Sequence, residues 1–177
     1  MDGSADRVAG AEHAAGAEHA AGAEHPALRA WLFVALVAAV VVGVDQLSKH
    51  LVETSIVRGE ERNVLPGLEL VNTRNQGVAF GFFPGRHIGV TILIAIALVV
   101  LLVYFARHVT RPLIWLPTGM LLGGAIGNIL DRIRHGQVTD FVKLPLGWPP
   151  FNLADACITV GIVLLFLVAE QGRRSDH

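Results

Sequence analysis

The sequence contains a single cysteine, Cys157, among its 177 residues. No disulfide can form within such a chain, and a cysteine-rich zinc site is excluded. Cys157 lies in an apolar run, where a thiol stays protonated and unreactive. It is therefore expected to be a small packing residue rather than a nucleophile.

Charged residues are also scarce. They make up 16% of the chain, whereas 53% of the residues are hydrophobic, which is too apolar for a soluble domain of this length. The net charge is -1 and the 14 Lys and Arg are scattered, so the chain has no basic patch for nucleic acid. The composition predicts a membrane protein with no nucleic-acid partner.

The first 28 residues are of low complexity. They contain three near-copies of the motif GAEHAA, starting at Gly10, Gly16 and Gly22, and the last copy ends in Pro-Ala. Histidines spaced six residues apart in an alanine-rich segment are more typical of a disordered tail than of a metal site. No secretory signal peptide is expected, because no apolar core begins before Ala30.

Four apolar segments follow the tail. Residues 88–106 and 112–130 are each 19 residues long without an acidic or basic side chain, close to the roughly 20 that a membrane-spanning helix needs. Residues 30–44 and 156–169 are shorter, and they reach that length only if neighbouring polar residues enter the edge of the membrane. The pattern predicts an all-α polytopic membrane protein with four transmembrane helices.

Successive crossings alternate in direction, and this places most polar residues of the apolar segments on one face. The end of the first segment, the end of the third and the start of the fourth meet there, with Asp45, Lys49, Asn128, Asp131, Arg132, Asn152 and Asp155. The same face carries residues 50–87, whose Pro-Gly turn and β-prone pairs predict a small β-element on the membrane surface. It also carries the loop 133–150, which contains Asp140.

The orientation of this face does not follow from charge counting. Six Lys or Arg belong to the side of the termini and eight to the polar face, so the positive-inside rule would not make the polar face external.

Two carboxylates on the polar face, Asp140 and Asp155, are 15 residues apart and separated by a loop that returns the chain to the membrane. In a partly dry pocket such a pair holds one proton between its members, which gives one acid and one base. Aspartic proteases use such an acid and base to activate a water molecule and to protonate the leaving amine, and this mechanism requires no metal or cofactor. Asn128 and Asn152 could orient a substrate amide or the carboxylates.

Structural roles remain open for the same residues. Asp45 and Lys49 are spaced for an ion pair on one helix, and Asp131 with Arg132 could bind across helices. Asn152 could simply cap the fourth helix and leave Asp155 in its first turn. Glycines at four-residue intervals on the third helix indicate close helix packing, at Gly119, Gly123 and Gly127.

Two other classes of function stay open. A small proton or ion carrier would use intramembrane charges as a relay, but it would distribute them through the depth of the membrane. A non-enzymatic assembly factor would tolerate substitution of Asp140 or Asp155.

Five motifs together resemble the bacterial lipoprotein signal peptidases, also called signal peptidase II. They are, in order along the chain, DQLSK (residues 45–49), NQGVAF (75–80), GGAIGNILDR (123–132), VTDF (138–141) and FNLAD (151–155). The resemblance covers roughly residues 30–170 and does not include the alanine-rich tail.

The resemblance implies an intramembrane aspartic endopeptidase of the bacterial cytoplasmic membrane with Asp140 and Asp155 as catalytic residues. The substrate would be a diacylglyceryl-modified prolipoprotein, cut on the amino side of the lipidated cysteine. The polar face would be extracytoplasmic, residues 50–87 would form a β-cradle, and a monomer in contact with membrane lipid is expected. Substrate-binding and positioning roles would belong to Asp45, Lys49, Asn75, Gly77, Asn128, Arg132 and Asn152.

These inferences divide the chain into three parts. Residues 1–28 would be a disordered cytoplasmic tail, residues 29–172 the membrane peptidase domain, and residues 173–177 a cytoplasmic C-terminal tail.

Overall fold

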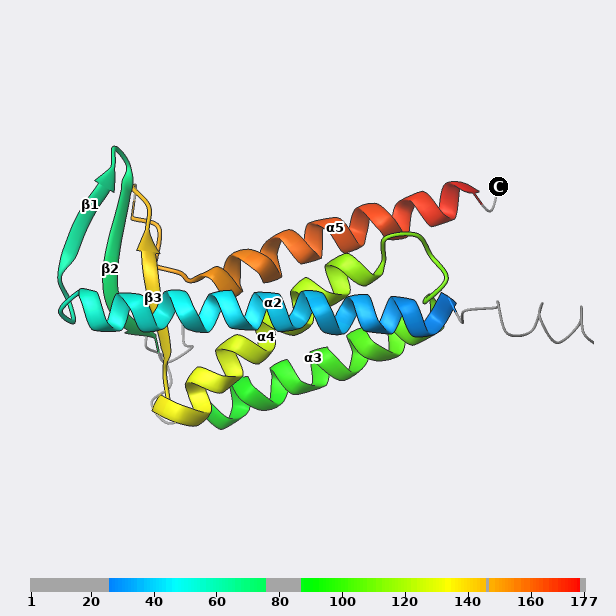
Figure 1. Cartoon of the computed structure of the whole chain (residues 1–177), viewed down its shortest axis with the longest axis horizontal. Helices are drawn as coiled ribbons and strands as arrows, with labels where there is room; N and C mark the ends of the chain where they lie inside the picture. Colours follow the sequence, from blue (N-terminus) through cyan, green and yellow to red (C-terminus); the bar gives the residue numbers. More distant parts are fainter. Residues whose placement is uncertain (1–25, 76–86, 146, 176–177) are drawn as a thin grey trace, which may run out of the picture.

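The computed structural model describes residues 26–75, 87–145 and 147–175. The helices of this part are α2 (Pro26–Ser55), α3 (His87–Arg107), α4 (Trp115–His135) and α5 (Leu153–Ser175). The strands are β1 (Glu61–Leu65), β2 (Leu68–Asn75) and β3 (Val138–Lys143). The helices run lengthwise, and the three-stranded sheet lies at one end of them (Figure 1).

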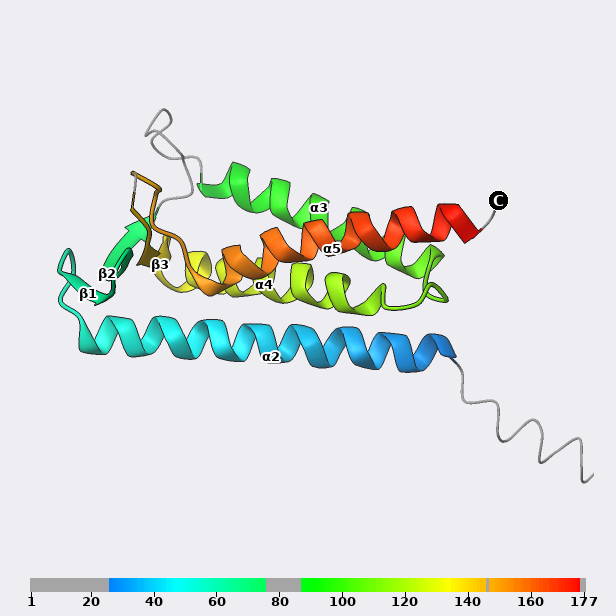
Figure 2. The same cartoon turned by 90° about the horizontal axis from the view of Figure 1, so that it is seen from above.

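Helix α4 lies between its neighbours and packs against both α2 and α5, with fewer contacts to α3 (Figure 2). The start of α2 and the end of α5 lie at the end of the bundle away from the sheet. The predicted glycine stripe is confirmed as a packing feature of α4. A Cβ added at Gly123 would lie 2.8 Å from the Ala38 carbonyl oxygen of α2, and one added at Gly119 would lie 2.7 Å from Val37. Only glycine allows the helices to approach so closely.

Among the described residues, two helices are long and apolar enough to cross a membrane, α2 with 30 residues and the 19-residue stretch Leu153–Gln171 of α5. Helix α3 supplies a shorter apolar stretch, Ile92–Arg107. The uncharged run of residues 30–44 was expected to reach the length of a crossing only if neighbouring polar residues join it. Helix α2 does continue through Asp45 and Lys49 to Ser55, and these two charges pair with each other one turn apart.

The outer surfaces of the helices are apolar. Leu36 of α2, Ile96 of α3 and Phe166 of α5 expose 60%, 56% and 73% of their area. Large exposed side chains on several helices are typical of a surface that contacts lipid.

The β-element predicted within residues 50–87 is confirmed as a β1–β2 hairpin. Leu65 pairs with Leu68 around Pro66 and Gly67, and Gly67 has φ +82°, the conformation that a type II turn needs at its third residue. The loop that was predicted to start at residue 50 starts only after Ser55, since residues 50–55 still belong to α2. Residues 76–86 lie outside the described part.

Strand β3 was not expected, because residues 133–150 were interpreted as a loop. It pairs antiparallel with β2, so that Asp140 lies opposite Thr73. Phe151 forms a further antiparallel bridge with Val142, which attaches the start of α5 to β3. The β-branched and aromatic residues of VTDFVK suit a strand, but the strand with which it pairs is far away in the sequence.

A small apolar cluster holds the sheet against the helices. Val52 in the last turns of α2 and Ile56 just after the helix pack with Phe141 of β3, next to Leu153 at the start of α5. Phe141 directly follows Asp140, so this cluster fixes the position of that carboxylate relative to α2 and α5.

Candidate active site

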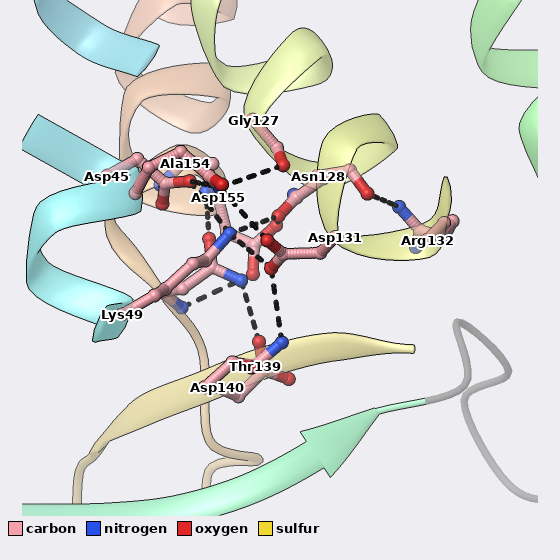
Figure 3. A network of polar contacts seen from close by, with 12 residues as sticks. Asp45, Lys49, Gly127, Asn128, Asp131, Arg132, Thr139, Asp140, Ala154 and Asp155 are labelled. Atoms are coloured by element: carbon pink, nitrogen blue, oxygen red, sulfur yellow. Dashed lines mark hydrogen bonds and ion pairs between the residues drawn. The ribbon is translucent and has the colours of Figure 1, made fainter. Parts of the chain in front are cut away.

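Polar side chains from α2, α4, β3 and the start of α5 meet at the sheet end of the bundle (Figure 3). Most are almost fully buried, with exposed fractions of 0–5% for Asp45, Lys49, Asn128, Asp131, Asp140 and Asn152. Asp155 is half-buried. Buried charges of this kind persist only when they are paired or hydrogen-bonded, and the network supplies such partners.

Asn152 joins the two candidate catalytic carboxylates. Its side-chain Nδ2 donates to Asp140 Oδ1 at 2.7 Å. Its Oδ1 accepts from the Asp155 N–H at 3.0 Å, while its own N–H lies 3.4 Å from Asp155 Oδ2. This reciprocal arrangement is a capping box, so Asn152 both caps α5 and links Asp140 to Asp155.

Asp140 accepts a second hydrogen bond from Asn75 at the end of β2, with 3.0 Å between Asn75 Nδ2 and Asp140 Oδ2. Burial raises the pKa of Asp140 to about 6, and the negative charge of Asp155 acts in the same direction. The amide donors of Asn75 and Asn152 oppose these effects without cancelling them. Asp140 is thus able to hold a proton in mildly acidic conditions.

The raised pKa of Asp140 predicts a specific pH dependence of stability. An unfolded aspartate ionises near pH 4, whereas folded Asp140 ionises near pH 6. Folding therefore loses stability as the pH rises from about 4 to 6, and the loss is about 3 kcal/mol for a shift of this size. We expect the difference in unfolding free energy between wild type and Asp140→Asn to change by that amount across this window. Unfolding curves in detergent at several pH values measure it, and parallel curves would contradict the prediction.

A second group forms around Lys49, whose ammonium lies 2.8 Å from Asp45 Oδ2 and 2.8 Å from Asp131 Oδ2. We refer to Lys49, Asp45 and Asp131 as the buried ion cluster. The remaining Asp45 oxygen accepts from the Ala154 N–H at 3.0 Å, which fixes α5 to α2. The cluster thus joins α2, α4 and the first turn of α5.

Asn128 connects the buried ion cluster to the carboxylate pair. Its Oδ1 accepts from Lys49 Nζ at 3.0 Å, and its Nδ2 donates to Asp155 Oδ1 at 2.8 Å. An ammonium group cannot accept a hydrogen bond, so the orientation of this amide is determined.

The structure thus brings together seven of the nine predicted site residues, namely Asp45, Lys49, Asn75, Asn128, Asp140, Asn152 and Asp155. Arg132 lies one turn beyond Asn128 and donates from Nη1 to the Asn128 carbonyl oxygen at 3.1 Å (Figure 3). The charges of Asp155 and Asp140 act on its guanidinium group, although neither carboxylate is its hydrogen-bond partner there. Gly77 lies outside the described residues.

Several members of the network were not among the predicted site residues. Gln46 donates to Asp131 Oδ1 at 2.9 Å and lies within the motif DQLSK, which was the available signal. Asp131 was interpreted as a residue that binds across helices, and its pairing with Lys49 confirms this. Thr139 donates to Glu53 Oε1 at 2.6 Å and no local pattern indicated that contact.

Within the described residues, no group of three or more His, Cys, Asp and Glu side chains is arranged to hold a metal ion. The carboxyl groups of Asp140 and Asp155 both contact Asn152, an arrangement that allows proton transfer.

Known proteins resemble this chain over most of its length. The sequence profile of the family described as "Signal peptidase (SPase) II" matches residues 37–169. A lipoprotein signal peptidase of Moorella thermoacetica is 40% identical over 147 residues, which cover 78% of this chain and 96% of the relative. One of Syntrophomonas wolfei is 40% identical over 139 residues, covering 77% and 93%.

Two solved structures described as bacterial membrane enzymes share the fold. One has a TM-score of 0.72 at 30% identity and matches 77% of this chain and 91% of its own. The other has a TM-score of 0.71 at 31% identity and matches 81% and 90%.

Proposed function

The chain belongs to the signal peptidase II family of membrane peptidases that process lipoproteins, and from this premise we propose that Asp140 and Asp155 hydrolyse the peptide bond before the diacylglyceryl cysteine of a prolipoprotein. The observation that carries the aspartic mechanism is the link through Asn152, which holds one oxygen of each carboxyl group within 3.4 Å of the same residue. Two carboxyl groups held in this way can share one proton and act as acid and base on one water molecule.

The other polar residues support this pair. Asn75, Asn128 and Asn152 orient the carboxyl groups through hydrogen bonds, while Asp45 and Lys49 hold the helices that carry them. Arg132 Nε is buried and makes no hydrogen bond to any described residue, so it is a donor for a substrate carbonyl. We assign Gly77 to the substrate-binding loop on the basis of the motif NQGVAF alone.

The placement in the membrane follows from the same proposal. Helices α2, α3, α4 and α5 cross the cytoplasmic membrane, within a peptidase domain of residues 29–172, and the protein acts as a monomer surrounded by lipid. Both terminal tails, residues 1–28 and 173–177, are cytoplasmic, and the sheet end of the bundle is extracytoplasmic. The hairpin then forms a cradle over the site. The described polar network draws on the ends of α2 and α4, on β3 and on the start of α5, which meet at one end of the bundle (Figure 1). This arrangement gives no support to a carrier that relays charge across the membrane.

A groove bounded by α3, α4 and α5 offers a place for the apolar segment of the signal peptide. It has a volume of about 450 Å³ and is lined by Ala97, Leu101, Leu121, Ala125, Ile158 and Ile162 among others. Ile158 lies about one helical turn after Asp155, so a helix in the groove ends beside the carboxylate pair. This continuity with the site favours the substrate helix over unspecific lipid.

Filling the groove is expected to weaken substrate binding. We predict that Ile162→Trp raises KM for a full-length prolipoprotein about tenfold with little change in kcat, which corresponds to about 1.4 kcal/mol of lost binding. Val163→Trp is the matched control, because Val163 is exposed on the adjacent position of α5 and does not line the groove. Equal effects of the two variants in a steady-state assay would show that lipid alone occupies the groove.

The proposed function is tested by incubating the purified protein in detergent with a diacylglyceryl prolipoprotein and with the same chain lacking the lipid. Mass spectrometry should find a product that begins with the lipidated cysteine, and cleavage should persist in the presence of a chelator. Cleavage at another bond would contradict the proposed specificity, and loss of activity with the chelator would contradict the metal-free mechanism.

A further inference from the structure

The buried ion cluster contains one ammonium and two carboxylates. The ammonium of Lys49 also donates a hydrogen bond to Asn128, which lies outside the cluster. Lys49 has three N–H donors, and three acceptors lie within 3.0 Å of its Nζ, on Asp45, Asp131 and Asn128. The third of these acceptors is the amide oxygen whose amide nitrogen faces Asp155. The positive charge of Lys49 therefore acts on Asp155 through one polarised amide.

Two further features favour a negative charge on Asp155. It is in the first turn of α5, where the helix dipole stabilises an anion. Its Oδ2 also faces the Asn152 backbone N–H at 3.4 Å. Both oxygens of Asp155 are thus directed at donors, one of which is polarised by a cation.

Asp140 is in a different environment. It lies on a strand rather than at a helix start, is 2% exposed, and accepts from the neutral amides of Asn75 and Asn152. Ionisable groups on the elements around it include Asp45, Lys49 and Glu53 of α2, Asp131 and Arg132 of α4, Arg74 of β2 and Asp155 of α5. Lys49, Asp131, Glu53 and Arg74 are engaged in ion pairs with one another or with Asp45. Burial raises the pKa of Asp140 to about 6, although the charge of Lys49 acts to lower it.

We propose that Lys49, acting through Asn128, is a positioning residue that makes Asp155 the ionised member of the pair and leaves the shared proton on Asp140. This inference rests on the proposed function and gives each carboxyl group a separate part in it. Asp155 takes a proton from the attacking water while Asp140 gives its proton to the substrate carbonyl oxygen, which yields a neutral gem-diol. Asp155 then protonates the amine as the C–N bond breaks. Asp140 recovers a proton from the diol as the carbonyl re-forms, so the pair returns to its starting state.

Infrared titration of the full-length protein in detergent tests this assignment. In Asp140→Asn the pair is represented by Asp155 alone, and in Asp155→Asn by Asp140 alone. The carbonyl band of the protonated acid should disappear at a pH at least one unit lower in Asp140→Asn than in Asp155→Asn. Asp45 and Asp131 are present in both variants, so their contribution cancels in the comparison. Equal or reversed midpoints would overturn the assignment.

The role of Lys49 is tested by removing the Asn128 amide that connects it to Asp155, in the Asp140→Asn and Asp155→Asn variants. Asn128→Leu leaves the buried ion cluster intact, so the protein should still fold, as a thermal melt can verify. We expect it to raise the titration midpoint by about one pH unit, a tenfold change in proton affinity, in the Asp140→Asn background and to leave the Asp155→Asn background unchanged. Equal shifts in both backgrounds, or none, would overturn the relay.

A charge-balanced double substitution separates the ammonium from the amide. Lys49→Met with Asp131→Asn keeps the net charge of the buried ion cluster and removes the bond to Asn128. The same upward shift is expected with Asp140→Asn, and an unchanged midpoint would show that Asn128 acts without Lys49. Wild-type cleavage of a prolipoprotein tests the proposed function separately, so either proposal can fail alone.

Discussion

Asp140→Asn and Asp155→Asn are each expected to reduce the cleavage rate of a diacylglyceryl prolipoprotein by about 100-fold to 10,000-fold. The asparagine side chain has nearly the same shape but cannot exchange a proton with water or with the leaving amine, and general acid–base catalysis contributes effects of this size. Initial rates with saturating substrate, measured on purified protein, give the ratio. Because each carboxyl group has its own part in the reaction, the carboxyl group that remains in either variant should not compensate for the one that was replaced.

A carboxylate outside the site provides the control. Glu69 of β2 lies on the sheet and pairs with Lys143 at 3.2 Å, away from the Asp140–Asp155 pair. Glu69→Gln should cleave at the wild-type rate, and all three variants should retain a wild-type thermal melt at acidic pH. If Asp140→Asn or Asp155→Asn folds normally and keeps more than about a tenth of the activity, the paired-carboxylate mechanism is wrong.

Lys49→Met is expected to cause the largest loss of stability among single substitutions in the site, about 3–5 kcal/mol. Lys49 is 3% exposed, and its removal leaves Asp45 and Asp131 as buried carboxylates without their cation. Breaking a buried ion pair from one side has a cost of this order because the remaining charge stays desolvated. Thermal or denaturant unfolding in detergent measures the loss.

Lys143→Met is the matched comparison. Lys143 also lies between two carboxylates, Glu61 and Glu69, but its side chain is 33% exposed. Exposed ion pairs contribute about 0–1 kcal/mol, so this variant should melt close to wild type. Asp131→Asn should partly restore the stability of Lys49→Met, because it removes one of the unpaired charges. Equal melting of the two lysine variants would mean that the buried ion cluster is not required for folding.

The parts of the site that the sequence predicted are those with local signals. The Asn152 cap and the position of Asp155 in the first turn of α5 follow from four consecutive residues. The carboxylate pair followed from two aspartates on either side of one loop. The interpretation of Asn152 as a helix cap and its interpretation as a site residue were alternatives in the sequence, and the structure shows that the side chain that caps α5 also donates to Asp140.

The parts that the sequence did not predict depend on residues far apart in the chain. Strand β3 pairs with β2. The β-prone pattern of its six residues does not indicate which strand is its partner. Thr139 and Glu53 are 86 residues apart, and Gln46 and Asp131 are 85 residues apart. A single sequence gives no information about such pairs, since hydrophobic periodicity reports burial and not which residue lies opposite.

The sequence by itself determined the apolar helices, the hairpin turn at Pro66 and Gly67, and the choice of Asp140 and Asp155 as the candidate catalytic residues. These features arise from interactions within a few residues, namely helical periodicity, turn conformation and end capping. The tertiary structure alone decided how far α2 continues, that Asp140 lies on a strand, and that Lys49 reaches Asp155 through Asn128. Lys49 and Asn128 are 79 residues apart, and their contact exists because glycines on α4 allow α2 to approach closely enough for the two side chains to meet.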